Sequence, residues 1–149
     1  MSIHSTIVNL IRTKAEAVNT LGQFIYGDDI FQTINYPNES EQAATAKPLI
    51  SLLPFTYILR TGESSNYNSG SLNMLFTRSA DPTDTAVRHE AIVNEMSTLA
   101  EAFITELNDT PSPVNYVISD VSFEGQKQIY MGTVSGCIVS FTINVQKPC

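Results

Sequence analysis

The stretch from Ser135 to Gln146 constrains the fold most strongly, because apolar and polar residues alternate along it with a single exception, Ile138. Successive side chains of a β-strand point to opposite faces of a sheet, so this period of two predicts a strand with one buried face. We expect the buried face to hold Cys137, Val139, Phe141, Ile143 and Val145. The other face is mostly small and polar, which predicts a sheet covered by helices on one side only.

Two segments have the spacing of amphipathic helices. The first spans residues 2–21, with Ser2 as its N-cap and Gly22 just past its end. The second begins with Asp81 as N-cap and Pro82 as the first helical residue, and it runs to Leu107. Its predicted apolar stripe consists of Ile92, Met96, Leu99, Phe103 and Leu107, widened by Val87, Ala100 and Ile104.

The remaining apolar stretches predict further strands, separated by turns and two loops. Residues 23–35 indicate a short hairpin, and residues 48–60 indicate one bent strand or two strands that meet at Pro54. Residues 71–78 and 114–123 predict two more strands, the second followed by a turn at 124–126. We expect exposed loops at 35–47 and 61–70, and the second of these forms the tip of a long hairpin.

This order of elements predicts the architecture of the whole chain. Helices segregated between runs of strands are typical of the α+β class, in which an antiparallel or mixed sheet carries its helices on one side. We therefore expect residues 1–149 to form a single α+β domain, with two helices packed on one side of the sheet and a long protruding β-hairpin.

Charge and cysteine content exclude several classes of protein. Eight scattered basic residues against 15 acidic ones give a net charge of -7, which argues against a patch that grips phosphates. No apolar run approaches the roughly 20 residues that span a bilayer, so no membrane contact is expected. The N-terminus lacks a signal-peptide layout, and two cysteines are too few for a disulfide framework. These features predict synthesis in a reducing cytoplasm.

Residues with catalytic chemistry are scarce. The chain has two histidines: His4 is expected at a frayed N-terminus, and His89 is expected as an exposed residue of the second helix. A hydrolase that uses His89 remains a minor hypothesis. No metal-ligand spacing and no glycine-rich phosphate loop is found, and we predict no catalytic, metal or cofactor-binding residue and no cofactor.

The two predicted loops carry our candidate contacts with other subunits or partners. Both loops are long for simple connections, and tyrosines of the kind enriched at interfaces lie in them. The predicted interface residues are Tyr36, Asn38, Glu63, Tyr67 and Asn68. The alternative is that both loops are merely mobile connections.

The order of elements resembles the small neck and tail proteins of tailed bacteriophages, particularly the tail-terminator and tail-completion group. Four segments carry this resemblance: Pro48–Leu52, Leu72–Phe76, Pro82–Leu107 and Ser135–Val145. It covers most of the chain from Ile7 onward and rests on element order rather than on a diagnostic motif. The predicted hairpin at 22–35 departs from the common pattern and leaves the type of ring open.

The resemblance implies a structural, non-enzymatic virion protein, made in the host bacterial cytoplasm. Such proteins form cyclic oligomers, here a hexamer or dodecamer, as tail terminator, head-tail connector or tail adaptor. Their neighbours are portal, connector or tail-tube proteins, and DNA passes through the ring without being specifically bound. The alternative hypothesis is a small-ligand-binding α+β domain, in which the sheet and the long helix enclose an apolar cavity.

Overall fold

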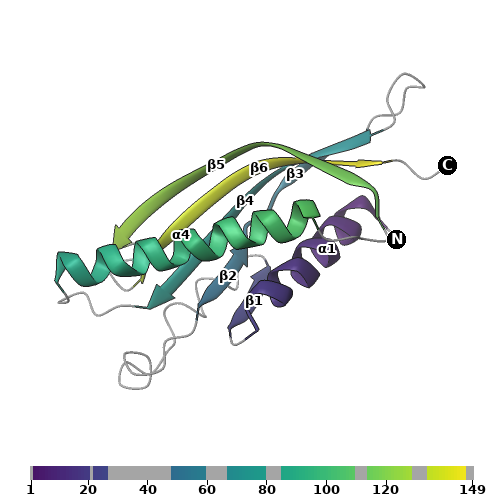
Figure 1. The fold of residues 1–149 in the computed structure, drawn as a ribbon. Helices are drawn as coiled ribbons and strands as arrows, with labels where there is room; N and C mark the ends of the chain where they lie inside the picture. Colours follow the sequence, from purple (N-terminus) through teal and green to yellow (C-terminus); the bar gives the residue numbers. More distant parts are fainter. Residues whose placement is uncertain are drawn as a thin grey trace.

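A computed structural model describes residues 2–20, 22–26, 48–59, 67–79, 85–109, 114–128 and 134–146. Within these ranges two helices lie on one face of a six-stranded mixed sheet (Figure 1), which confirms the predicted α+β class. In chain order the elements are α1 (Ile3–Val18), β1 (Gln23–Tyr26), β2 (Leu49–Leu52), β3 (Thr56–Ile58), β4 (Tyr67–Ser79), α4 (Ala86–Asp109), β5 (Tyr116–Gln128) and β6 (Val134–Gln146).

The long strands β4 and β6 form the centre of the sheet. The strand order is β1-β2-β4-β6-β5, and β3 pairs with β4 on the side that β2 also occupies. The pair β1–β2 is parallel, and every other pair is antiparallel. Among the described strands, β5 therefore forms one edge of the sheet, and β1 and β3 lie at the opposite edge.

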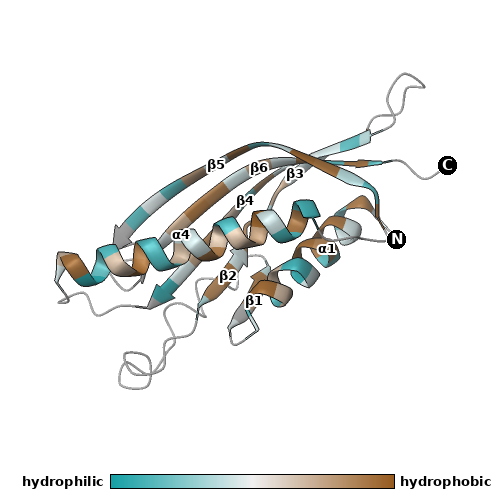
Figure 2. Ribbon diagram, viewed as in Figure 1, coloured by the Kyte–Doolittle hydropathy of each residue, from teal (hydrophilic) through white to brown (hydrophobic). Residues whose placement is uncertain are grey.

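The core fills the space between the helices and the sheet. The apolar face predicted for β6 is confirmed, because its five alternate side chains are all buried. Three phenylalanine rings pack together across the layers: Phe103 of α4 lies 5.5 Å from Phe76 of β4 and 6.5 Å from Phe141 of β6. Figure 2 shows hydrophobic residues along β6 and on successive turns of both helices. Burial of this apolar surface is the main force that holds helices on sheet.

Helix α1 begins where the sequence predicts and ends earlier. The Ser2 side chain accepts a hydrogen bond from the Ser5 N–H (3.1 Å), which confirms the predicted N-cap. The helix ends at Val18 rather than at residue 21, because Asn19 leaves the helical conformation. Gly22 is therefore not the residue that follows the helix end.

Gly22 instead lies against the start of β2. A Cβ atom at this position would overlap the Asn19 side chain and the Pro48 carbonyl oxygen. The Asn19 Nδ2 group donates a hydrogen bond to the same carbonyl, over 3.0 Å. Glycine is therefore required by the close approach of two chain segments rather than by a helix terminus.

Helix α4 begins at Ala86, later than the predicted start. Asp81 and Pro82 lie outside the described residues, and the observed N-cap is Thr85, whose hydroxyl accepts from the Arg88 N–H (3.3 Å). Val87, expected to widen the apolar stripe, is 78% exposed. The reason is geometric: five residues separate it from Ile92, which places it about 140° around a helix of 3.6 residues per turn.

The predicted turn at 124–126 is wrong, because β5 continues through it to Gln128. Gly125 pairs with Cys137 inside the ladder. A Cβ atom on Gly125 would lie 2.6 Å from Cγ1 of Val93, so this glycine permits α4 to pack closely on β5. The glycine that suggests a turn in the sequence is a packing residue of the sheet.

A β-bulge interrupts β5 halfway along its length. The pairing with β6 shifts between Ser119 and Ser122, so that two residues of β5 face one residue of β6. Asp120 in the bulge has a φ of 55°, the left-handed conformation that Asp tolerates better than most residues. Bulges of this kind bend a strand and interrupt regular pairing locally.

Residues 48–60 form two strands rather than one. Strands β2 and β3 both pair antiparallel with β4, and they are separated at Pro54, as the second of the two predicted alternatives requires. The extended run predicted at 23–26 is confirmed as β1, whose described partner is β2 in a parallel pair; the hairpin itself stays a prediction. The second half of that hairpin and the loop 35–47 lie outside the described residues.

The long hairpin is tested only at its base. Residues 60–66 lie outside the described residues, so a protruding tip remains a prediction. Strand β4 already begins at Tyr67, however, and residues 67–70 therefore belong to the sheet rather than to the predicted loop 61–70.

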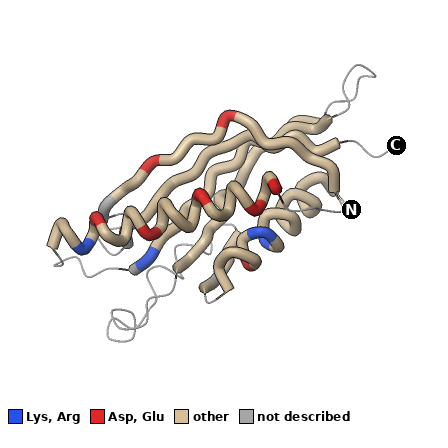
Figure 3. The backbone as a smooth tube through the Cα atoms, viewed as in Figure 1, with Lys and Arg blue, Asp and Glu red and all other residues tan. Residues whose placement is uncertain are grey.

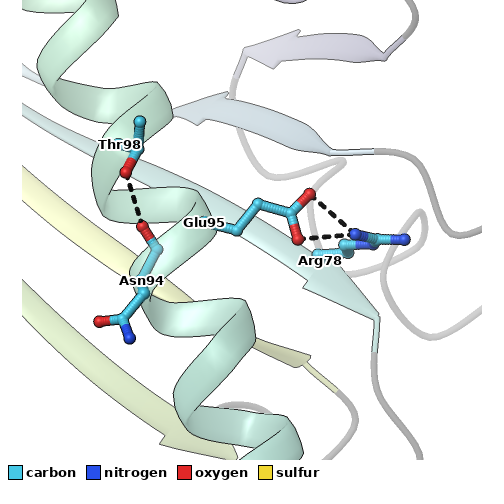
Figure 4. A network of polar contacts seen from close by, with 4 residues as sticks. All are labelled: Arg78, Asn94, Glu95 and Thr98. Atoms are coloured by element: carbon cyan, nitrogen blue, oxygen red, sulfur yellow. Dashed lines mark hydrogen bonds and ion pairs between the residues drawn. The ribbon is translucent and has the colours of Figure 1, made fainter.

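An ion pair fastens the end of β4 to α4. Arg78 Nη1 lies 2.7 and 2.8 Å from the two carboxylate oxygens of Glu95 (Figure 4). In the same view, the Thr98 hydroxyl donates to the Asn94 carbonyl oxygen (3.0 Å), which is a bond within the helix. Both partners of the ion pair are partly exposed, so water screens their attraction.

Candidate assembly surface

The sheet face opposite the helices carries no charge over a wide area. The same alternation that buries one side of β4 and β6 points small polar residues to the other side. We name this surface the neutral face, and it consists of Thr56, Ile58, Tyr67, Ser69, Ser71, Asn73, Val117, Ser119, Ser122, Ser140, Thr142, Asn144 and Gln146. None of these side chains is buried.

Side chains of the neutral face bond to one another across strands. The Ser69 hydroxyl donates to the Asn144 side-chain oxygen (2.7 Å), and the Ser140 hydroxyl donates to the Asn73 side-chain oxygen (2.6 Å). Each of these pairs lies directly opposite in the β4–β6 ladder. These two bonds pair four polar side chains with one another, so a partner could cover these groups at a lower desolvation cost than unpaired polar groups would carry.

Charged residues of the described strands and helices lie beside the neutral face, on β5, or on the helix side of the sheet. Figure 3 shows acidic residues along α4 and on β5, while β6 carries no charged residue. On β5 the acidic side chains are Asp120 in the bulge and Glu124 beyond it. In a chain of net charge -7, a neutral area of this kind has the charge depletion found at the centre of protein interfaces.

Exposed apolar side chains lie at both edges of the neutral face. Ile58 of β3 is 56% exposed, and the adjacent Leu59 is exposed to a similar degree. At the opposite edge Val117 of β5 is 54% exposed. We call these the β3 rim (Ile58) and the β5 rim (Val117).

The structure describes two of the five predicted interface residues, and these two face opposite sides of the sheet. Tyr36, Asn38 and Glu63 lie outside the described residues. Tyr67 lies on the neutral face and is 38% exposed, whereas Asn68 points to the helix side of the sheet and is 4% exposed. Neighbouring residues of a strand face opposite ways, so these two cannot share one surface.

His4 anchors the start of α1 rather than fraying. Its Nε2 atom lies 2.7 Å from the Tyr26 hydroxyl, and its ring stacks on Phe55 at 5.1 Å with an interplanar angle of 8°. Tyr57 completes this half-buried cluster. The contacts join α1, the end of β1, the link between β2 and β3, and β3 itself, so the cluster holds the start of the helix against this end of the sheet.

His89 is buried rather than exposed, which corrects the sequence prediction. Its Nδ1 atom lies 2.9 Å from the Ser135 hydroxyl, and the two residues are 2% and 0% exposed. A hydroxyl beside an imidazole resembles a nucleophile and its base. In this conformation, however, the pair is closed to solvent between α4 and β6, and it acts as a polar link inside the core.

The buried thiol of Cys137 is held in its neutral form. Burial raises the pKa of Cys137, and this effect exceeds the opposing hydrogen bonds from Ser97 and from the Glu124 backbone. A raised pKa disfavours the thiolate, which is the reactive and metal-binding form. Within the described ranges, no three His, Cys, Asp or Glu side chains converge as a metal site requires.

A shallow, open hollow of about 450 Å³ lies on the solvent side of α4, next to Val87, Glu90 and Asn94. The ligand-binding hypothesis expects its cavity elsewhere, in the apolar space between helix and sheet. That space is occupied by fully buried side chains such as Phe76 and Phe103.

Comparison with known proteins gives this chain no family. No protein-family model matches the sequence, and no curated protein matches it. Neither described helix is long and apolar enough to cross a membrane.

Proposed function

We propose that this chain is a non-enzymatic structural subunit that assembles with copies of itself into a ring. One observation carries the proposal: two different apolar rims lie at opposite edges of an uncharged sheet face. A ring needs a head-to-tail interface, in which one patch of a subunit meets a different patch of the next. The β3 rim and the β5 rim have this arrangement, whereas a two-fold dimer would need only one patch.

The resemblance in element order to phage neck and tail proteins suggests where such a ring acts. In that setting the chain is a tail terminator, head-tail connector or tail adaptor in the virion, next to portal, connector or tail-tube proteins. The neutral face and the acidic helix α4 offer no cluster of Lys or Arg to DNA phosphates. A surface without such a cluster lets DNA pass without binding it.

The oligomeric state tests the ring directly. Light scattering after size-exclusion chromatography should give one closed oligomer, and electron microscopy should show a ring. Val117→Lys should convert it to monomer, because a charge would be desolvated at the contact. Val87→Lys is the matched control, since Val87 is equally apolar, lies on α4 and is still more exposed. A wild-type monomer at micromolar concentration would overturn the proposal.

The location in the virion is a separate question with a separate measurement. Mass spectrometry of purified particles should detect the chain at a fixed number of copies per particle. A stable ring that is absent from particles would leave the assembly intact and remove the phage assignment.

A further inference from the structure

We propose that neighbouring subunits join by extending one another's sheets, with β5 of one copy pairing antiparallel with β3 of the next. In this pairing Val117 lies opposite Ile58 of the neighbouring copy. The inference rests on the proposed ring and specifies the contact that builds it. It follows from strand direction, from cross-strand register and from the orientation of backbone groups.

Strand direction permits this pairing without reorienting either subunit. Strand β3 is antiparallel to β4, β4 to β6, and β6 to β5. Strands β3 and β5 of one chain therefore run in opposite directions. When two copies stand side by side in the same orientation, β5 of the first meets an antiparallel β3 of the second.

The register places the two apolar rims at the same height. Ile58 pairs with Ser69, Ser69 with Asn144, and Asn144 with Val117. These four residues form one row across the sheet, with an exposed apolar side chain at each end. Continuing the row into the next copy brings its Ile58 beside Val117 with no shift along the strands.

The structure shows which residues of β5 point their backbone N–H and C=O groups toward β6 and which point them toward the open edge. The Gln146 N–H donates to the Asn115 carbonyl oxygen over 2.9 Å. In an antiparallel ladder every second residue turns its N–H and C=O toward the same neighbour. Val117 and Ser119 therefore turn their backbone toward β6, and Ile118 turns its backbone toward the open edge.

Following the same alternation from β6 through β4 shows which residues of β3 point their backbone groups outward. Even-numbered residues of β6 point their backbone N–H and C=O groups toward β5, so its odd-numbered residues point theirs toward β4. These odd-numbered residues lie opposite even-numbered residues of β4, which therefore point their backbone groups toward β6. The odd-numbered residues of β4 consequently point their backbone groups toward β3. The bond from the Leu53 N–H to the Asn73 carbonyl oxygen (3.0 Å) agrees with this alternation. Ile58 therefore turns its backbone toward β4, and Tyr57 turns its backbone outward.

In the proposed register the outward backbone groups of β5 face the outward backbone groups of β3 in the next copy. With Val117 opposite Ile58, Ile118 lies opposite Tyr57, so the outward groups of both strands meet as a hydrogen-bonded pair. Val117 and Ile58 then form a pair of the other type, in which the side chains approach most closely. A register shifted by one residue would place outward backbone groups of one strand opposite residues of the other strand whose backbone groups turn inward, so no hydrogen-bonded pair would form.

Length and charge also favour a second copy of this chain as the occupant. The bulge at Asp120 interrupts the pairing of β5 after Ser119, so the segment before it, residues 116–119, is close in length to the three residues of β3. Pairing of β5 with β6 resumes at Ser122, and the strand has to bend at the bulge so that this second part passes β1 of the next copy. Neither segment contains a charged residue, so no like charges would meet directly at the contact. Open sheet edges tend to pair with other strands, and among the described strands each copy offers two that match, β3 and β5.

Cysteine cross-linking tests the register. We would introduce Ile58→Cys and Val117→Cys together with Cys149→Ser, and add a mild thiol oxidant such as diamide. Cα atoms of such a pair lie about 4.5 Å apart, within the reach of a disulfide. A ladder of covalent oligomers up to the size of the ring is expected. The control pairs Ile58→Cys with Val87→Cys and should give no ladder.

The possible results distinguish the proposed strand pairing from the proposed ring. An intact ring without a ladder would overturn the strand pairing and leave the proposed function standing. Efficient dimers from Val117→Cys alone would show a two-fold pairing of β5 with β5 and overturn it as well. A monomeric wild type would remove both proposals.

Hydrogen exchange gives a readout that needs no cysteine. The Ile118 amide should be protected in the ring and should exchange in the Val117→Lys monomer. The Val117 amide faces β6 and should be protected in both. Rapid exchange of Ile118 in the intact ring would contradict the pairing.

Discussion

The two faces of the sheet are built from alternate residues of the same strands, and they differ in almost every property. The helix side of β4 and β6 is made of large apolar side chains such as Phe76 and Ile143, which are fully buried. The outer side carries Ser71, Thr142 and their neighbours, which are small, uncharged and partly or fully exposed. Because neighbouring residues serve different faces, mutations can test the stability of the core and the proposed assembly separately.

The largest expected loss of stability comes from a substitution in the core, on the helix side of the sheet. Phe103→Ala should lower the free energy of unfolding by about 3–5 kcal/mol, because it removes a fully buried ring and leaves a cavity between Phe76 and Phe141. Denaturant unfolding monitored by circular dichroism measures this loss. Thr105→Ala, on the exposed side of the same helix, is the control and should change stability by less than about 0.5 kcal/mol. A loss below about 1 kcal/mol for Phe103→Ala would show that the stripe does not hold the core.

The two faces also differ in how well the sequence predicts them. The buried side of β6 and most of the α4 stripe follow from local periodicity, because a strand or helix imposes its own repeat. His89 lies three residues before Ile92 and continues the same stripe, but a polar residue type hides this. Gly125 suggests a turn locally, although its role depends on Val93 of a distant helix.

The sequence does not predict the positions of the β3 rim and the β5 rim, for a different reason. Ile58 and Val117 are far apart in the chain, and only cross-strand register places them at the two ends of one row. Tyr67 was predicted as an interface residue in a loop, whereas it lies on a strand. The alternation of Tyr67, Ser69, Ser71 and Asn73 contains this signal, but turn-forming residues nearby obscure it.

A medium loss of stability is expected when the buried polar residue His89, on the helix side of the sheet, is replaced. His89→Ala removes the partner of the Ser135 hydroxyl and a side chain packed between α4 and β6, so a loss of about 1–3 kcal/mol is expected. A double-mutant cycle with Ser135→Ala separates the hydrogen bond from the lost packing. No coupling between the two substitutions would mean that the bond contributes nothing to stability.

A smaller effect is expected at the end of α4, where the Tyr116 hydroxyl donates to the Leu107 carbonyl oxygen. Tyr116→Phe should cost about 0.5–1.5 kcal/mol at neutral pH. Burial, and secondarily the negative charge of Glu106, raise the pKa of Tyr116. The folded state thus favours the neutral phenol, and this contribution is complete below the unfolded pKa of about 10 and is lost as pH rises above it.

Alkaline unfolding distinguishes this contribution from simple packing. Stability of the wild type relative to Tyr116→Phe should decrease as pH rises above about 10, the value for an unperturbed tyrosine. Melting temperatures measured between neutral and alkaline pH give the comparison. A constant difference at all pH values would show that the hydroxyl titrates alike in the folded and unfolded chain.

The smallest effect on stability is expected at the centre of the neutral face. Ser71→Lys adds a charge at an exposed position, and the free energy of unfolding should change by less than about 0.5 kcal/mol. Assembly then distinguishes two ways of using the face. If subunits join edge to edge, Ser71 lies away from both rims and the ring should persist in light scattering.

Stacking of two neutral faces predicts the opposite result, because a lysine at Ser71 would be buried without a partner and would dissociate the oligomer. Thr56→Lys sharpens the comparison, since Thr56 lies in the same row as Ser71 but on the edge strand β3. Edge pairing predicts that Thr56→Lys weakens the ring more than Ser71→Lys does, whereas stacked faces predict the reverse order. Together the two variants decide whether the neutral face is the contact or the open surface between two contacts.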